Sequence, residues 1–183
     1  MDAAGTAPPP AVWGVVRVPS AGAAPTDAPR GLAGLLVVVD AGSRPAVGGR
    51  VTIVPIDASA TTAQAFAAAI RAAPASAGAV AWFDATLPPP GTIAHLVARL
   101  GTRDAVVVAT PVSDAVKQVR DGLIVGGVAR DGLCRPAAPV LVRARAARER
   151  LLPALDDGHD PFEAFGVAGC TVAVLTPAAH APG

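Results

Sequence analysis

The chain has 183 residues, a length that fits one domain with a hydrophobic core of its own. Apolar residues make up 52% of the sequence and aromatic residues only 3%, so Val, Leu, Ile and Ala must form most of that core. The net charge of +1 gives no strong electrostatic field, which argues against proteins that bind nucleic acid or anionic membranes.

The sequence also bears on the cellular location of the protein and on the state of its cysteines. No apolar run is long enough to cross a bilayer, and the first residues lack the charged and apolar regions of a secretory signal, so we expect a cytoplasmic protein. The content of Ala, Arg, Gly and Pro is typical of high-GC bacterial genes. Cys134 and Cys170 lie far apart without metal-ligating neighbours, which predicts two unpaired thiols.

The N-terminal part predicts a tail, a strand and a loop. Residues 1–11 are small, polar or proline, as in a disordered tail, and residues 12–183 are predicted to form a single domain. The β-type run 12–18 precedes the small-residue loop 19–25. In doubly wound folds such a loop binds phosphate, because its backbone N–H groups converge on an anion. The alternative is an ordinary surface loop.

Two further strands are predicted at residues 35–40 and 50–56. The segment between them is too short for the helical crossover that parallel neighbours ordinarily need. We therefore predict an antiparallel hairpin or an edge pair, the alternative being that a crossover helix has been lost.

Residues 61–73 are the clearest predicted helix, with a possible N-cap in residues 57–59 and an apolar i, i+4 pair in Phe66 and Ile70. The next predicted strand, 79–83, leads to Asp84. Ligands of open α/β sheets bind beyond the carboxyl ends of strands, so Asp84 is a candidate ligand of Mg²⁺ and nucleotide phosphates. The alternative is that it caps the following turn.

A second helix is predicted over residues 92–100, ended by Gly101. His95 on this helix is predicted to be a surface or half-buried residue and not a catalyst.

Residues 104–150 predict an arm. The strand 105–109 precedes a polar ribbon with Asp114 and Lys117, a β-type run at 123–128 and a bend at 130–133. Two short β segments that leave a core strand and return before a helix predict an arm, here about residues 110–139. An arm of two strands buries too little surface alone, which predicts a homodimer.

The C-terminal part predicts a helix over residues 140–155 that Pro153 ends or kinks. Asp160 is predicted to cap a short helix at 161–165, and residues 169–175 to form the last strand. We expect the arginines of the long helix to form a solvated face and not a nucleic-acid site: Arg143, Arg145, Arg148 and Arg150.

Several of these motifs, in this order, resemble the 2-C-methyl-D-erythritol 4-phosphate cytidylyltransferase family. The resemblance rests on AVAWFDA at 79–85, TPVSDAVKQV at 110–119, RDGL at 130–133 and the pair Ala138-Pro139, and it spans residues 61–174. It implies an α/β fold with a Rossmann-like, three-layer nucleotidyltransferase sheet, mostly parallel, and a projecting β-arm.

The resemblance also implies site residues. Nucleotide-binding positions are Pro19, Ala21, Gly22 and Asp84, of which Asp84 is the metal ligand. Substrate-binding positions are Asp114, Lys117 and Arg130, and the last two would hold an acceptor phosphate across the dimer. The catalytic positions implied are Arg30, Asp84, Lys117 and Arg130. The alternative for the arm residues is that they are solvated charges.

The chain departs from the family pattern where the chemistry takes place. In the phosphate loop, Ala24 replaces the family's second glycine and Thr26 its arginine. Leu87 replaces the arginine that follows the aspartate, and Ala115 and Ala138 replace two threonines. The family's final segment with a lysine is absent. The resemblance implies nucleotidyl transfer from CTP to a polyol phosphate, in an isoprenoid-precursor lineage, with Mg²⁺ and with weak or no activity. The alternative is a pseudoenzyme: a non-catalytic dimeric binding or regulatory protein.

Overall fold

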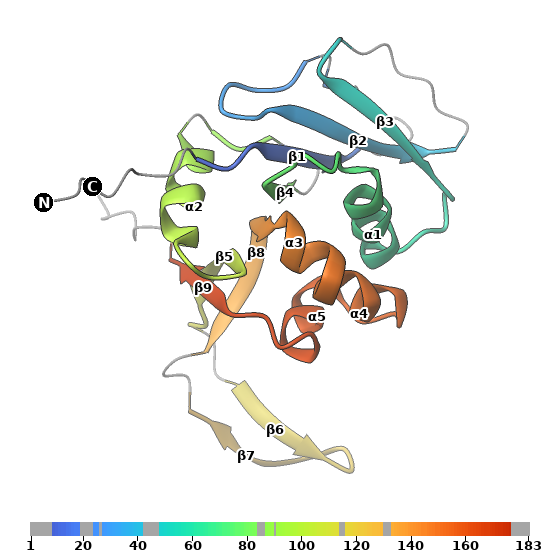
Figure 1. Cartoon of the computed structure of the whole chain (residues 1–183). Coiled ribbons are helices and arrows are strands. Elements are labelled where there is room, and N and C mark those ends of the chain that lie inside the picture. The colour runs from blue at the N-terminus through green and yellow to red at the C-terminus, as the bar shows by residue number, and fades with distance from the viewer. Residues whose placement is uncertain are drawn as a thin grey trace, which may run out of the picture.

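The computed structural model describes residues 9–18, 24–25, 27–41, 48–83, 87–89, 91–113, 116–129 and 133–176. A seven-stranded sheet of order β3-β2-β1-β4-β8-β5-β9 forms its centre, and β6 and β7 form a separate two-stranded sheet (Figure 1). The strands are β1 (Val12–Arg17), β2 (Gly34–Asp40), β3 (Val51–Ile56), β4 (Ala79–Phe83), β5 (Ala105–Pro111), β6 (Val116–Arg120), β7 (Leu123–Val128), β8 (Cys134–Arg143) and β9 (Val172–Leu175).

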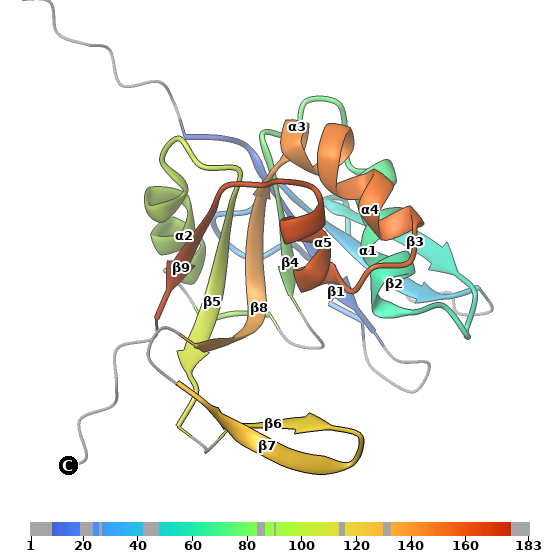
Figure 2. The same cartoon turned by 90° about the horizontal axis from the view of Figure 1, so that it is seen from below.

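Helices cover both faces of the central sheet. They are α1 (Thr62–Ala72), α2 (Thr92–Leu100), α3 (Ala144–Ala146), the π-helical turn η1 (Ala147–Leu151), α4 (Leu152–Asp156) and α5 (Pro161–Val167). Helix α2 packs on one face, and the other helices pack on the opposite face (Figure 2). The predicted three-layer α/β architecture is confirmed.

The described part of the central sheet is parallel except at β8, which runs antiparallel to its neighbours β4 and β5. Parallel strands buried on both faces are typically continuous apolar runs. The Leu-Leu-Val-Val-Val run of β2 fits this rule, since its side chains are at most 3% exposed. This agrees with the predicted Rossmann-like sheet.

The predicted antiparallel hairpin at residues 35–40 and 50–56 is wrong, because β2 and β3 pair in parallel. Strand β3 lies at the edge of the sheet, as the edge-pair alternative expected. The connection, residues 41–50, is ten residues long. Ten residues can reach roughly 33 Å when extended, and a six-residue strand is only about 20 Å long, so a chain of this length can return without a helix.

The predicted helix over residues 140–155 begins later than expected. Residues Val140, Leu141 and Val142 belong to β8, where their side chains are at most 3% exposed. The β-branched valines suit a strand between two neighbours, and the helical segment starts at Ala144. It also continues past Pro153 to Asp156, with the π-turn η1 directly before α4. A wider turn there suits Pro153, which has no N–H and would crowd a regular preceding turn.

Helix α1 is capped at Thr61 and not within residues 57–59. The Thr61 hydroxyl accepts from the Gln64 N–H at 3.2 Å, and the Gln64 side chain accepts from the Thr61 N–H at 2.8 Å, which completes a capping box. Asp57 instead accepts from the side chain and the backbone N–H of Ser59, and these bonds lower its pKa. The predicted cap of α5 is confirmed, because Asp160 accepts from the Phe162 N–H at 2.9 Å.

The projecting arm is confirmed as an antiparallel pair, β6 and β7, that extends away from the central sheet (Figure 1). Its side chains are largely exposed, including Leu123 at 70% and Ile124 at 69%. The domain boundary at residue 12 stays a prediction, and residues 1–8 lie outside the described part of the chain.

Both cysteines are free, as predicted. Burial raises the pKa of the Cys170 thiol, and this effect outweighs the opposite effect of the Arg150 charge. None of the helices in the described ranges is long and apolar enough to span a membrane.

Candidate functional site

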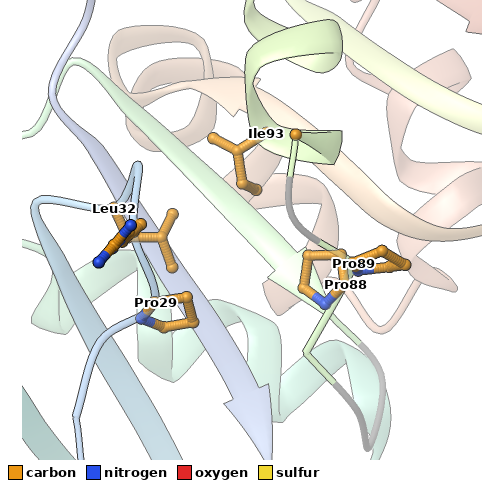
Figure 3. A pocket seen from close by; sticks show the side chains of 7 residues that line it. Pro29, Leu32, Pro88, Pro89 and Ile93 are labelled. Carbon is orange, nitrogen blue, oxygen red and sulfur yellow. The ribbon is translucent and has the colours of Figure 1, made fainter.

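A pocket of about 270 Å³ lies on the α2 face of the sheet (Figure 3). One wall comes from the connection between β1 and β2, and the other from the segment that leads from β4 into α2. Figure 3 shows Pro29 and Leu32 on one side and Pro88, Pro89 and Ile93 on the other. The residues that line it are Pro29, Arg30, Leu32, Pro88, Pro89, Gly91 and Ile93.

A second pocket of about 240 Å³ shares Pro88 and Pro89 with the first. Its other lining residues are Phe83, Leu87, Thr92, Ala138 and Pro139. Phe83 is the last residue of β4, so the second pocket lies at the carboxyl end of that strand. We call them together the α2-face groove; their position is where open α/β sheets bind ligands.

Close packing on Gly14 positions the Leu32 wall of the groove. A Cβ atom at Gly14 would lie 2.6 Å from Cδ1 of Leu32 and 2.9 Å from Cε2 of Phe83, distances at which atoms overlap. The wall is also held from outside, because the Arg50 guanidinium donates to the Ala28 carbonyl at 2.8 Å and to the Leu32 carbonyl at 3.2 Å. These two hydrogen bonds from Arg50 therefore brace this wall of the groove.

Gly14→Ala is expected to lower the free energy of unfolding by about 1–3 kcal/mol, because the added methyl group overpacks a filled core. Urea denaturation measures this change. Gly49→Ala is the matched control, since a Cβ at Gly49 meets no atom within 4 Å. Equal stabilities of the two variants would contradict the close approach at Gly14.

The opposite wall is stiff for local reasons. Pro88 and Pro89 have restricted backbone angles, and Gly91 caps α2 with a φ of 87°, a left-handed conformation that glycine adopts without strain. The His95 N–H donates to the Gly91 carbonyl at 3.1 Å and closes the first turn. His95 itself is exposed, as predicted.

The structure brings one predicted site residue, Arg30, into the groove. Among the groove's described lining residues it is the one ionisable side chain, and it lies across from the segment that follows Asp84 in the sequence. Lys117 lies on β6 in the arm, where it is exposed and outside the groove. The remaining predicted residues lie outside the described part of the chain: Pro19, Ala21, Gly22, Asp84, Asp114 and Arg130.

No group of three or more His, Cys, Asp or Glu side chains that could hold a metal ion occurs within the residues that the structure places. The predicted metal ligand, Asp84, is not one of those residues.

The arginines predicted to form a solvated face mostly have structural contacts. The Arg148 guanidinium donates to the Pro74 carbonyl at 2.7 Å, and Arg150 pairs with Asp104. Arg143 donates to the carbonyls of Gly101 and Arg103. Only Arg145, in an i, i+4 pair with Glu149 at 2.9 Å, fits the predicted solvated face. The other three stabilise the packing of the helical segment on its neighbours.

Sequence reasoning missed a pocket of about 400 Å³ on the opposite face of the sheet. It is lined by Thr62, Phe66, Trp82, Pro136, Ala137, Ala138, Val140, Asp160, Pro161, Phe162 and Phe165, and we call it the aromatic pocket. The chain has two Trp and four Phe residues, and four of these six line this pocket. The small number of aromatic residues was the one sequence feature that could have drawn attention to this pocket. The four that line it come from α1, β4 and α5, which only folding brings together.

Comparison with known proteins identifies the fold. No family model and no curated protein sequence matches the chain. A solved 4-diphosphocytidyl-2C-methyl-D-erythritol synthase from Anaerococcus prevotii superposes with a TM-score of 0.68 at 12% identity, covering 92% of this chain and 89% of that one.

Two structures titled 2-C-methyl-D-erythritol 4-phosphate cytidylyltransferase are also similar. The Francisella tularensis protein has a TM-score of 0.67 at 16% identity, over 92% of this chain and 91% of that one. The Thermus thermophilus protein has a TM-score of 0.65 at 21% identity, over 82% of this chain and 75% of that one. The chain therefore has the fold of the 2-C-methyl-D-erythritol 4-phosphate cytidylyltransferases.

Proposed function

We propose that this chain binds a nucleoside triphosphate, CTP, in the α2-face groove and transfers its nucleotidyl group to a polyol phosphate weakly or not at all. The observation that supports the proposal is the position of Arg30 in a groove at the carboxyl end of β4, in a fold shared with cytidylyltransferases. A guanidinium is suited to phosphate, because its planar fork can donate two parallel hydrogen bonds.

In this proposal each predicted site residue has a role. Backbone N–H groups around Pro19, Ala21 and Gly22 bind phosphate oxygens, Arg30 offsets their charge, and Asp84 holds Mg²⁺. Asp114, Lys117 and Arg130 of a partner's arm bind the acceptor phosphate. The acceptor oxygen would attack the α-phosphorus and pyrophosphate would leave, a reaction that depends on positioning and charge stabilisation.

The scarcity of cations in the described lining of the groove supports weak or absent turnover. Arg30 is the one charged residue among the groove's described lining, and Ala138 lines it where the resembling family has a threonine. Each transition-state donor that is lost typically lowers the rate by about 10²–10³-fold. These substitutions support the second candidate function, a non-catalytic dimeric binding protein that retains the nucleotide site.

Arg30→Ala is expected to weaken CTP binding about tenfold or more, because the variant loses a charge-assisted contact to phosphate. Isothermal titration with CTP and Mg²⁺ measures this, with ATP and UTP to test base selectivity. Asp84→Ala should abolish the Mg²⁺-dependent part of the heat. The matched control is Arg99→Ala, an exposed arginine of α2 outside the groove. Absence of saturable heat with any nucleotide at millimolar concentration would overturn the proposal.

If CTP binds, a pyrophosphate-release assay with 2-C-methyl-D-erythritol 4-phosphate separates the two candidate functions. Turnover above the uncatalysed rate that is lost in Asp84→Ala supports the weak enzyme. Binding without any release of pyrophosphate supports the non-catalytic protein.

We also propose that the chain forms a homodimer through the arm. Of the seven exposed large apolar side chains in the described ranges, Val119, Leu123, Ile124, Val125 and Val128 lie on the arm. Leu123→Asp with Ile124→Asp is therefore expected to convert a dimer to a monomer in analytical ultracentrifugation, because both charges would have to be buried. Val167→Asp, at a 57% exposed position on α5, is the control. A wild-type monomer at micromolar concentration would contradict this prediction.

A further inference from the structure

The aromatic pocket lies on the opposite face of the sheet from the α2-face groove, and the two share one lining residue, Ala138. Trp82 and Phe83 are neighbours in β4, so their side chains point to opposite faces of the sheet, Trp82 into the aromatic pocket and Phe83 into the groove. A volume of about 400 Å³ is within the range of small-molecule sites. Neither the fold nor the proposed nucleotide site accounts for this cavity.

Four of its eleven lining residues are aromatic, and three of them, Phe66, Trp82 and Phe165, are at most 5% exposed. Phe66 of α1 and Trp82 of β4 have ring centroids 5.0 Å apart and planes inclined at 47°, so they form two walls at an angle. Phe165 of α5 is buried, and Phe162 of the same helix is half-buried. The remaining apolar lining consists of proline, alanine and valine residues of β8 and α5.

The ionisable part of the pocket's described lining is negative, while Arg135 directly precedes the lining residue Pro136 in β8. Among the lining residues that the structure describes, Asp160 is the one ionisable side chain, and residues 151–176 contain no Lys or Arg. Nearby acidic groups have partners: Asp156 pairs with Arg71 at 2.5 Å, and Glu163 lies 3.6 Å from His159. Asp160 forms no ion pair with any residue that the structure describes; its Oδ1 accepts only the Phe162 N–H.

We propose that the aromatic pocket binds a small organic cation with an apolar body, whose ammonium group lies near the Asp160 carboxylate and the aromatic rings. Ring faces attract cations through their negative quadrupole, and this attraction grows where water is excluded. A phosphate or carboxylate would lose its hydration beside Asp160 without gaining a cation in return. The pocket therefore selects for positive charge, and this inference does not depend on nucleotide binding in the groove.

Three probes of similar body and different charge test the proposal: benzyltrimethylammonium, benzyl alcohol and benzyl phosphate. Binding is followed by tryptophan fluorescence in the Trp13→Phe variant, in which Trp82 is the one remaining tryptophan. We expect saturable quenching by the cation, with an affinity at least about tenfold higher than that of the alcohol, and no saturation by the phosphate.

Asp160→Asn separates a ligand contact from a structural role, because asparagine caps a helix as well as aspartate does. We expect this variant to bind the cation about fivefold more weakly than the wild type does, with unchanged thermal stability. Asp157→Asn, in the same turn but outside the pocket lining, should bind as the wild type does. Equal affinity for all three probes, tighter binding of the phosphate, or no binding of the cation at millimolar concentration would each overturn the proposal.

Discussion

Phe66→Ala should lower the free energy of unfolding by about 3–5 kcal/mol, the usual cost of truncating a buried phenylalanine. Phe66 is 1% exposed and packs against Trp82 at a centroid separation of 5.0 Å. It lies on α1, so its ring joins that helix to the central strand β4. The expected loss has two parts: the transfer energy of the ring and the cavity left between helix and sheet.

Urea denaturation followed by far-UV circular dichroism gives the free energy. Phe66→Leu keeps most of the apolar volume and should lose less than half as much. Ala72→Gly, at the exposed last residue of α1, reports the cost of disturbing the helix alone, which should be below the roughly 1 kcal/mol that glycine costs in a helix interior. If Phe66→Ala were no more destabilising than Ala72→Gly, then α1 would not be anchored on the sheet by this ring.

Asp104→Ala is expected to lower the free energy of unfolding by about 2–3 kcal/mol at pH 7, because its carboxylate has three partners. It accepts from the Thr171 N–H and the Thr171 hydroxyl, both at 2.7 Å, and it pairs with Arg150. Asp104 directly precedes β5, Thr171 directly precedes β9, and Arg150 belongs to η1. One carboxylate therefore connects three segments that are distant in the sequence.

The same contacts predict a pH dependence. Burial raises the pKa of Asp104, but the hydrogen bonds from Thr171 and the charge of Arg150 together outweigh it and lower the pKa from 3.8. Because the folded-state pKa is the lower one, the stabilisation is present above the unfolded pKa and is lost as the pH falls through the folded value. The difference in stability between wild type and Asp104→Asn should therefore shrink between about pH 5 and pH 3.

Chemical denaturation at pH 7, 5, 4 and 3 measures this difference. Asp157→Asn, at an exposed turn position, serves as the control and should follow the wild type across the whole range. A constant gap between wild type and Asp104→Asn down to pH 3 would show that the carboxylate contributes no charge-dependent stability.

Local residue patterns were enough to predict most elements of this fold. As predicted, the apolar runs at 12–18 and 79–83 form strands, and the Phe66/Ile70 spacing lies on a helix. These signals are local: side-chain periodicity, caps and helix breakers act within a few residues. The projecting arm was also predictable, because two short β segments between a core strand and a helix have few other arrangements.

Strand direction and the start of the last long helix were not predictable in this way. The parallel pairing of β2 with β3 depends on how far ten residues can reach, and the assignment of residues 140–142 to β8 depends on the gap between β4 and β5. A run such as Val-Leu-Val satisfies both a buried strand and a buried helix, and its neighbours in space decide between them.

The two candidate sites also differ in whether the sequence alone could indicate them. The resemblance pointed to Arg30, and the structure places that residue in the groove. The aromatic pocket, in contrast, collects Phe66, Trp82 and Phe162 from segments up to about a hundred residues apart, and no local motif connects them. Local sequence determines which segments become helices and strands, because those signals act over one or two turns. Cavities and their charge are properties of packing between distant segments, so they exist only in the folded chain.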